Sequence, residues 1–544
     1  MAALGVCAAS GEPLRVTVDL SSAKTGKTIA NKFSDINVWM IDSTWLKTVA
    51  DYPDDYFKRR FPFVERIQLM AATGGNAARD LFVNPTNRAT TADTDFRPLI
   101  KACENIRAKG LKPMIKTGWV PLKLSANPRI GKAFKTNLRP PCDYDAYYAY
   151  IRTAAEALKA RFGVEDMRSW SWGVGVEYEN KDWFEAEDGR PESTKAAYCK
   201  LYDYTVAALT DALGTGNLTV GAHSMTVSEG LWDERDFIEH CAKGINAKTG
   251  ETGTQLDFLA ISYYTKVPGF DSEKFLKAIR TVREKADQVG LARVKIGIDE
   301  GRVLDGWDNR VLYPRETEHP IQAASDARLF QLMVEHDVDY FSMWRLTTRG
   351  VFGGIPAVST HLRSLAFRMV GSRTLAETAS GEPADPKDIV GVLSGFDAGH
   401  HVLRILAYNL NLDQRAQSRE SAALCVDRVK PRGRTDVTVR TWRLDADHGN
   451  WWKPWQADIA ARHMGKDAFK YSVWTFALPS ELSKSADAAF WKSREADYGK
   501  AGEMRPSEEQ RAVNPDGTLT LPTDLPPEGV VLYEIFPVEA ASAP

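Results

Sequence analysis

The sequence predicts an α/β protein in which a (β/α)8 TIM barrel is followed by a C-terminal antiparallel β-sandwich domain. Between residues 31 and 371, short β-branched or aromatic runs alternate with longer segments of 3.6-residue periodicity, as in parallel βαβ units. After Gly371 the chain changes to short alternating segments separated by Gly, Pro and Asp, which is typical of a sandwich. A doubly wound sheet is the competing fold, but no Gly-x-Gly-x-x-Gly follows the first barrel strand.

Eight strand candidates lie in the predicted barrel domain, residues 31–371. Eight strands that alternate with helices close most simply into a barrel. The intervening helices show one apolar face, as at Phe275, Leu276, Ile279 and Val282 before the seventh strand. The strand candidates are Ile36–Ile41, Ile67–Ala71, Lys112–Thr117, Trp170–Glu177, Leu218–Ala222, Phe258–Tyr264, Val294–Glu300 and Tyr340–Trp344.

The two remaining segments are assigned to the accessory domain. Residues 372–544 are predicted to form the β-sandwich. Residues 1–30 are predicted to hold a possible signal remnant and a strand, Leu14–Leu20, that joins the sandwich. Ser483–Pro526 is charged, contains Pro and gives no periodic signal. The sandwich strand candidates are Ile389–Leu393, His401–Asn409, Asp436–Leu444, Lys470–Ala477 and Gly529–Pro537.

Composition argues against several classes of function. The 70 basic and 72 acidic residues give a net charge of −2, so no strong field favours nucleic acid or an anionic membrane. No apolar run approaches the ~18 residues of a spanning helix. The six cysteines show neither a Cys-x-x-Cys pair nor a metal-ligand spacing. The small, apolar first ten residues suggest a truncated signal peptide, and hence a secreted or periplasmic protein.

Fifteen tryptophans point to carbohydrate chemistry, because apolar sugar faces stack on aromatic rings. In a TIM barrel the active site lies at the C-terminal ends of the strands. Glu177 ends the fourth strand candidate and Glu300 ends the seventh. These strands face each other across the barrel mouth, so both carboxyls can flank one glycosidic bond. Retaining glycosidases use such a pair at ~5–5.5 Å, one group protonating the leaving oxygen and the other attacking the anomeric carbon.

The sequence around both carboxylates resembles the clan A retaining glycosidases, and within them glycoside hydrolase family 39, which holds β-xylosidases and α-L-iduronidases. That family carries Trp-Asn-Glu-Pro at the end of strand four, followed by an aromatic pair. This chain has Glu177 in Gly-Val-Glu-Tyr, with Trp183-Phe184 at the matching distance. At strand seven, Asp299-Glu300, Leu304 and Gly306-Trp307 reproduce an iduronidase-like pattern. The resemblance implies Glu177 as acid/base and Glu300 as nucleophile.

Two other segments resemble the family. Phe258–Tyr264 looks like the sixth-strand segment that ends in Ser, His and Tyr; Ser262 matches, and Tyr264 stands where the family usually has His. We expect Tyr264 to hydrogen-bond the nucleophile and to hold it ionised. Thr441–Asn450 resembles part of the family's C-terminal sandwich, so the resemblance covers most of the chain.

The chain departs from the family beside the acid/base. Val176 replaces the Asn that normally binds the sugar 2-hydroxyl, so another polar group takes this role or the substrate presents that position differently. Glu179, two residues further on, is the alternative acid, although the spacing to Trp183 favours Glu177.

Further residues at the predicted barrel mouth are candidate substrate contacts. Tryptophans at three strand ends are possible stacking platforms, and polar residues of the second loop and the fifth strand are candidates for binding hydroxyls. For His223 a purely structural role is the alternative. The candidate substrate-binding residues are Trp39, Arg79, Asp80, Trp119, His223, Tyr264, Trp307 and Trp344.

The predicted function is therefore a retaining glycoside hydrolase that acts on an oligosaccharide or polysaccharide by double displacement. No metal or organic cofactor is implied, and a homo-oligomer is possible. Loss of the Asn before Glu177 motivates one alternative, a carbohydrate-binding pseudoenzyme. A metal-dependent barrel isomerase or lyase is the other; it needs three or more Asp, Glu or His at neighbouring strand ends, where His223 and Glu300 form no cluster. Xylose, arabinose, galactose and uronic acids all suit this fold.

Overall fold

The computed structural model describes residues 14–76, 80–132, 135–225, 230–266, 272–305, 320–344, 351–352, 355–411, 419–464 and 484–539. The candidate signal remnant at residues 1–10, the strand candidate at Lys470–Ala477 and the candidate contacts Arg79 and Trp307 lie outside these ranges. In the part of the chain that is described, no helix is long and apolar enough to cross a membrane.

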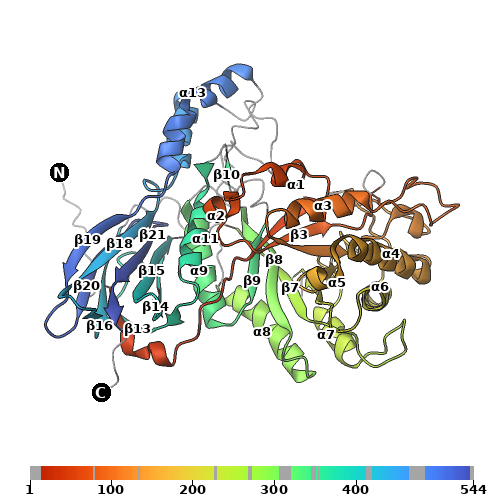
Figure 1. The fold of residues 1–544 in the computed structure, drawn as a ribbon, viewed down its shortest axis with the longest axis horizontal. Coiled ribbons are helices and arrows are strands. Elements are labelled where there is room, and N and C mark those ends of the chain that lie inside the picture. The colour runs from red at the N-terminus through yellow and green to blue at the C-terminus, as the bar shows by residue number, and fades with distance from the viewer. Residues whose placement is uncertain are drawn as a thin grey trace, which may run out of the picture.

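A closed barrel of eight parallel strands forms one half of the molecule (Figure 1). Each strand pairs in parallel with the next, and the last pairs with the first at Ile36 and Met343. The predicted fold class is confirmed, and each strand coincides with one of the eight candidates. The strands are β2 (Asp35–Met40), β3 (Arg66–Ala71), β4 (Lys112–Thr117), β5 (Ser171–Val174), β6 (Val220–Ser224), β7 (Phe258–Lys266), β8 (Lys295–Asp305) and β9 (Tyr340–Met343).

Helices surround the barrel and bury its outer face. They present the apolar faces expected from the sequence; Phe275, Ile279 and Val282, for example, are buried. The helices are α1 (Thr44–Thr48), α2 (Tyr56–Arg60), α3 (Arg97–Arg107), α4 (Tyr144–Phe162), α5 (Val164–Met167), α6 (Pro191–Leu213), α7 (Glu234–Lys243), α8 (Ser272–Gln288), α9 (Pro320–Glu335) and α11 (Val358–Arg368), with short 3-10 turns at Leu20–Lys24, Val49–Asp51 and Leu122–Leu124.

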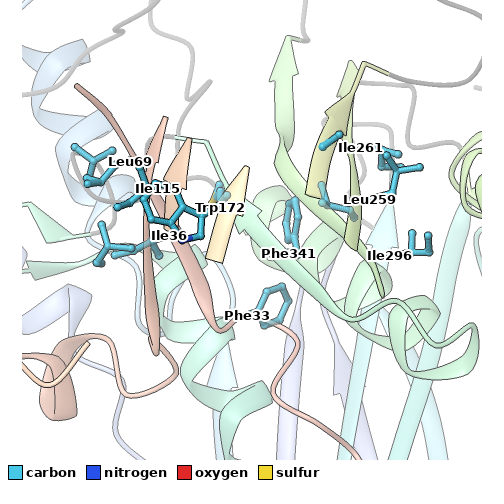
Figure 2. Packing of buried hydrophobic residues seen from close by; sticks show 14 of the residues in the cluster. Phe33, Ile36, Leu69, Ile115, Trp172, Leu259, Ile261, Ile296 and Phe341 are labelled. Carbon is cyan, nitrogen blue, oxygen red and sulfur yellow. The ribbon is translucent and has the colours of Figure 1, made fainter. Parts of the chain in front are cut away.

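The main hydrophobic core fills the layer between strands and helices. Figure 2 shows part of it, with Ile36, Leu69, Ile115 and Trp172 from four of the strands. Because successive residues of a strand point to opposite faces, the neighbours of these residues point into the barrel. There the chain places polar side chains that are nearly or fully buried, namely Asn37, Gln68, Lys116 and Asp299.

The second half of the molecule is a sandwich of two sheets, seen beside the barrel in Figure 1. The first sheet has the order β13 (Ala376–Ser380), β1 (Arg15–Asp19), β16 (Glu420–Asp427), β20 (Leu519–Leu525). The second has the order β12 (Arg373–Thr374), β14 (Asp388–Asp397), β15 (Val402–Asn411), β21 (Val530–Phe536), β18 (Asp436–Leu444), β19 (Ser507–Ala512). Two short ladders join β10 (Val351–Phe352) to β11 (Ile355–Pro356) and β17 (Lys430–Pro431) to β22 (Val538–Glu539).

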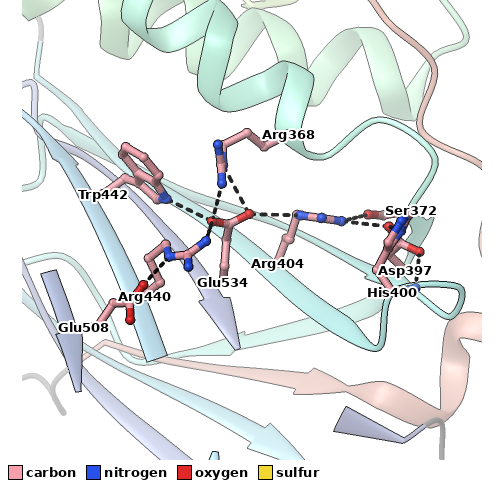
Figure 3. A network of polar contacts seen from close by, with 9 residues as sticks. All are labelled: Arg368, Ser372, Asp397, His400, Arg404, Arg440, Trp442, Glu508 and Glu534. Atoms are coloured by element: carbon pink, nitrogen blue, oxygen red, sulfur yellow. Dashed lines mark hydrogen bonds and ion pairs between the residues drawn. The ribbon is translucent and has the colours of Figure 1, made fainter. Parts of the chain in front are cut away.

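A buried carboxylate ties the two halves together. Glu534 of β21 accepts hydrogen bonds from Arg368 of α11 at 2.9 Å and from Trp442 of β18 at 3.0 Å (Figure 3). Arg368 also lies over the Trp442 ring, and Arg404 of β15 approaches the same carboxylate. Charged hydrogen bonds of this kind are directional, so this network fixes the sandwich against the last barrel helix.

The stretch Ser483–Pro526 contains regular structure that its sequence does not signal. It holds the helix α13 (Ser485–Gly502) and the strands β19 and β20. On α13 only a narrow stripe is buried, with Trp491 stacked on Tyr498, and Trp491 packs against Trp455 of α12 (Trp452–Ala461). A stripe this narrow leaves a mostly polar helix, which explains why no periodicity is visible.

Candidate active site

Glu177 lies three residues beyond β5, on a loop with left-handed backbone. Its φ is +45°, and that of Gly175 is +76°. This conformation costs a non-glycine residue on the order of 1 kcal/mol, so surrounding contacts must hold it. The Glu177 carboxylate accepts three hydrogen bonds of 2.7 Å, from Ser262 Oγ to Oε1 and from Asn180 Nδ2 and Trp183 Nε1 to Oε2. These donors fix the position and orientation of the carboxylate.

Glu300 lies within β8 at a β-bulge. The β7–β8 register shifts here, so that Ser262 pairs with Glu300 and Asp299 is the extra residue. A bulge re-aims side chains, and here it lets two consecutive carboxylates find separate partners. Tyr264 donates a hydrogen bond of 2.9 Å to Glu300 Oε2, as expected from the sequence. The expectation that this contact holds Glu300 ionised is not met, because burial outweighs it and raises the pKa of Glu300. The other oxygen, Glu300 Oε1, is buried and has no hydrogen-bond partner among the described residues.

The two glutamates meet over one face of β7. Ser262 binds Glu177, and Tyr264, two residues further on the same strand face, binds Glu300. These positions are ~6–7 Å apart along a strand, which brings the carboxylates close to each other. Burial, and after it the charge of Glu177, raises the pKa of Glu300 to about 8. The pair therefore keeps one proton at neutral pH.

Glu179, the alternative acid, is enclosed elsewhere. Its Oε1 accepts hydrogen bonds from Ser224 Oγ at 2.6 Å and Met225 N at 2.8 Å. The backbone of Gly230 lies so close over the Glu179 side chain that even a methyl group there would collide with it. Burial raises the pKa of Glu179 to about 8, but its side chain is 0% exposed, against 7% for Glu177. The contacts with β7 thus favour Glu177 as the group that faces Glu300.

Comparison with known proteins gives a family for this site. Residues 94–302, which include both glutamates, match the model of the glycosyl hydrolases family 39. This part of the barrel is therefore similar to glycosyl hydrolase family 39.

Two known proteins are similar in sequence over part of their length. The chain is 26% identical over 245 residues to a β-xylosidase of Caldicellulosiruptor saccharolyticus, covering 44% of this chain and 46% of that protein. It is 24% identical over 258 residues to a β-xylosidase of Geobacillus stearothermophilus, covering 46% and 48%. The similarity thus spans about half the length of these relatives.

The fold has a counterpart among solved structures. The crystal structure of a monomeric β-xylosidase from Caulobacter crescentus CB15 matches with a TM-score of 0.66 at 17% identity. The match covers 96% of this chain and 99% of that one, so barrel and sandwich are both shared.

Tryptophans from four parts of the barrel gather beside Glu177. The Trp39 ring lies 5.2 Å from that of Trp119 and 5.4 Å from those of Trp183 and Trp344. Trp119 and Trp344 are buried, whereas Trp39 and Trp183 are partly exposed. The three predicted platforms are therefore brought together, and Trp183 links them to Glu177 through its indole N–H.

Val176 is part of the apolar surroundings of this cluster. It is buried and packs in one hydrophobic cluster with Met40, Met70 and Trp119. The position before Glu177, where family 39 carries Asn, is thus an apolar contact in this chain.

Two of the predicted polar contacts are engaged within the protein. Asp80 accepts hydrogen bonds from the backbone N–H groups of Gly75 at 2.5 Å and Leu122 at 2.8 Å, so it orders the second loop. His223 is 1% exposed, with Lys116 at one ring nitrogen and Ser262 at the other. Both side chains therefore have hydrogen-bond partners within the protein. Among the described residues, no group of three or more His, Cys, Asp or Glu is arranged to hold a metal ion.

Asn180 was not among the sequence candidates. It follows Glu177 by three residues, and its amide turns back to Glu177 Oε2. Short-range contacts of Asn side chains are common in turns, so the run Glu-Tyr-Glu-Asn held a weak signal for it. Trp183, the first residue of the aromatic pair after Glu177, donates a hydrogen bond to the same oxygen.

Replacing Tyr264 by Phe is expected to lower kcat about 10- to 100-fold, because the charged form of Glu300 loses its one hydrogen-bond donor. Burial, with the charges of Glu300 and Glu177, raises the pKa of Tyr264 well above 10, so the wild-type hydroxyl stays protonated and donates. The matched control is Tyr263→Phe, on the opposite strand face against Phe275, which should leave kcat within about threefold. Equal rates for both variants would contradict a role of Tyr264 at Glu300.

Proposed function

We propose that the protein is a retaining glycoside hydrolase in which Glu177 is the acid/base and Glu300 the nucleophile. The observation that carries this proposal is the pair of carboxylates facing each other over β7, each with a distinct hydrogen-bond environment. Glu300 Oε1 has no hydrogen-bond partner among the described residues, so no donor holds it back from attack. Glu177 has three donors that stabilise the carboxylate formed once its proton has left.

In the first step, Glu300 Oε1 attacks the anomeric carbon while the bond to the leaving oxygen breaks. The leaving oxygen takes the bond electrons and the proton held by Glu177. The positive charge that develops on the sugar favours the ionised form of Glu300, so it draws the shared proton of the pair to Glu177. A covalent glycosyl–Glu300 ester results.

In the second step, the Glu177 carboxylate takes a proton from a water molecule. The water oxygen attacks the anomeric carbon, and the ester bond to Glu300 breaks. The sugar leaves with its original anomeric configuration, and the pair again shares one proton. Only proton transfer and charge at these two groups are needed.

The aromatic cluster supports a sugar as substrate. Trp39 and Trp183 expose ring surface beside Glu177, where the apolar face of a pyranose ring can stack. Val176 offers no hydrogen bond at the neighbouring position. We therefore propose that binding of the sugar next to the bond being cleaved relies on stacking more than on a hydrogen bond from that position.

A screen of nitrophenyl glycosides, beginning with β-D-xylosides because two relatives are named β-xylosidases, tests the proposal. The sugar found should then be offered as its 2-deoxy-2-fluoro glycosyl fluoride, and peptide mass mapping should find the label on Glu300. Absence of hydrolysis across the screen and of any label would support a carbohydrate-binding protein instead. Labelling of a different residue would refute the assigned nucleophile.

The rate is expected to fall at high pH as the carboxylate pair loses its last proton. The pKa of Glu300 is raised to about 8, so above pH 8 both groups are charged and no proton remains for the leaving group. The alkaline limb of kcat/KM for a phenyl glycoside should therefore lie near pH 8. The Glu177→Gln variant should be assayed with a 2,4-dinitrophenyl glycoside, whose leaving group needs no acid. The fall in rate near pH 8 should then be absent. A limb unchanged by this substitution would contradict the assignment.

A further inference from the structure

A line of buried polar contacts, one ion pair followed by three hydrogen bonds, connects the residue beside Glu300 to Glu177. Asp299 Oδ2 lies 2.5 Å from Lys116 Nζ, which lies 3.1 Å from His223 Nδ1. His223 Nε2 lies 2.9 Å from Ser262 Oγ, and Ser262 donates to Glu177 Oε1 at 2.7 Å. All four side chains before Glu177 are at most 3% exposed. We call this chain, Asp299–Lys116–His223–Ser262, the relay.

The relay has one direction. An ammonium group has donors only, so Lys116 donates and His223 Nδ1 accepts. Burial, and then the Lys116 charge, lowers the pKa of His223 well below its usual value, so the imidazole is neutral and its one proton is on Nε2. Nε2–H therefore donates to Ser262, whose own hydroxyl proton is directed to Glu177. Each hydrogen bond polarises the next toward Glu177.

The surrounding chain makes room for this arrangement. A side chain at Gly173 would come within 2.9 Å of the Lys116 stem, and one at Gly297 within 2.2 Å of the Tyr340 ring. Tyr340 in turn donates a hydrogen bond of 2.8 Å to Asp299, and Gln68 donates one of 3.0 Å. These contacts anchor the start of the relay on the inner face of the barrel.

The backbone couples the other end of the relay to Glu177. Tyr178 N, directly after Glu177, donates to the carbonyl of His223 at 3.0 Å. The strained Glu177 backbone is thus held by β6 as well as by the Ser262 side chain. A strained conformation persists only where its surroundings determine it in this way.

We propose that Ser262 and His223 are positioning residues that hold Glu177 Oε1 and so keep the carboxyl group oriented to deliver its proton to the leaving group. This inference rests on the proposed function, because it assigns a role toward the acid/base. A positioning role of Ser262 and His223 predicts a different result from a purely structural role. Cutting the relay should harm the proton transfer from Glu177 and leave attack by Glu300 nearly unchanged.

The test compares two substrates of the sugar found by the screen, a 2,4-dinitrophenyl glycoside and a phenyl glycoside. Ser262→Ala should lower kcat/KM for the phenyl glycoside about 10- to 100-fold, because a hydrogen bond to a charged group is lost, and that for the dinitrophenyl glycoside less than about threefold. Ser262→Thr keeps the hydroxyl and should restore most of the loss. An equal fall on both substrates, or no fall on either, would overturn the proposal.

Ser224→Ala is the matched control. It removes a hydroxyl that donates to the buried Glu179 on the neighbouring strand, at 2.6 Å. Its effect on the two substrates should be equal, so their kcat/KM ratio should stay at the wild-type value. If Ser224→Ala changed this ratio as much as Ser262→Ala does, the effect of Ser262→Ala would reflect a general disturbance of the barrel and would contradict the proposal.

A double-mutant cycle tests His223. His223→Phe keeps a ring of similar size and should reduce phenyl glycoside turnover about 3- to 10-fold, since Ser262 keeps its hydroxyl but loses its donor. In the Ser262→Ala background the same change should have no further effect. Additive losses would show that His223 does not act through Ser262.

A crystal structure of Ser262→Ala keeps the proposal testable even without a known sugar. The Glu177 carboxyl should leave its present position, with Asn180 and Trp183 still in place. An unmoved carboxyl would overturn the proposal. Failure of the proposed function shows differently, as a wild-type protein that hydrolyses no glycoside in the screen.

Discussion

Glu300→Gln is expected to lower kcat/KM for every glycoside substrate by at least about 10³-fold, whatever the leaving group. The amide cannot form the covalent ester, and no other carboxylate lies at this position in the described site. The variant should also resist labelling by the fluoro sugar. The residual kcat/KM of the variant should be measured at pH 6 and at pH 8. Because an amide does not titrate, we expect the two values to be similar.

The same variant should be more stable than the wild type at high pH. The pKa of Glu300 is raised to about 8 in the folded protein, above its ordinary 4.5, so its stabilising contribution is complete below 4.5 and is lost as pH rises through 8. Gln does not ionise and so loses no stability in this range. The stability of the variant relative to the wild type should therefore rise between pH 4.5 and 8, to on the order of 1–4 kcal/mol. Thermal melting at pH 5 and pH 8.5 measures it. If the variant were less stable than the wild type at both pH values, burial of the charged Glu300 carboxylate would not be destabilising.

Glu177→Gln is expected to separate substrates by leaving group. For phenyl glycosides and natural glycosides, kcat/KM should fall about 10²- to 10⁴-fold, because proton donation is lost. For a 2,4-dinitrophenyl glycoside it should fall less than about tenfold, since that leaving group needs little protonation. The three donors to the carboxylate can bind the amide oxygen only in part, so some loss of order at Asn180 and Trp183 is expected as well.

Glu179→Gln provides the control for this prediction. Glu179 is a buried glutamate of the same loop, bound to Ser224 and Met225 and covered by Gly230. Its replacement should change the leaving-group dependence by less than about threefold. If Glu179→Gln reproduced the profile expected of Glu177→Gln, the acid/base would have to be reassigned.

The barrel could be predicted from the sequence because its signals are local. Strands such as Lys112–Thr117 and helices such as Tyr144–Phe162 carry their hydrophobic period within a few residues, and the alternation of the two leaves few topologies. α13 could not be predicted in this way. Its helix is supported by Trp455, far away in the sequence, and by the stack of Trp491 on Tyr498, so its own pattern is weak.

The site was predictable to a similar degree. Position at a strand end and local motif suffice to select Glu177 and Glu300 as candidates, since both properties are encoded nearby in the chain. The choice against Glu179 became clear only from contacts, because two residues on one loop differ in which strand they reach. The same holds for Asp80, an acid of the second loop whose oxygens accept hydrogen bonds from backbone N–H groups.

The sequence by itself therefore determined the fold class, the carboxylate pair and the expectation of a Tyr264–Glu300 contact. Only the tertiary structure decided how these groups act together. The bulge at Asp299 turns that side chain into the barrel beside Lys116, while Glu300 faces Tyr264. The relay to Glu177 then runs through β4, β6 and β7, three strands that are distant in sequence. Hydrogen bonds between such strands depend on register and on the space left by Gly173 and Gly297, and no local pattern encodes either.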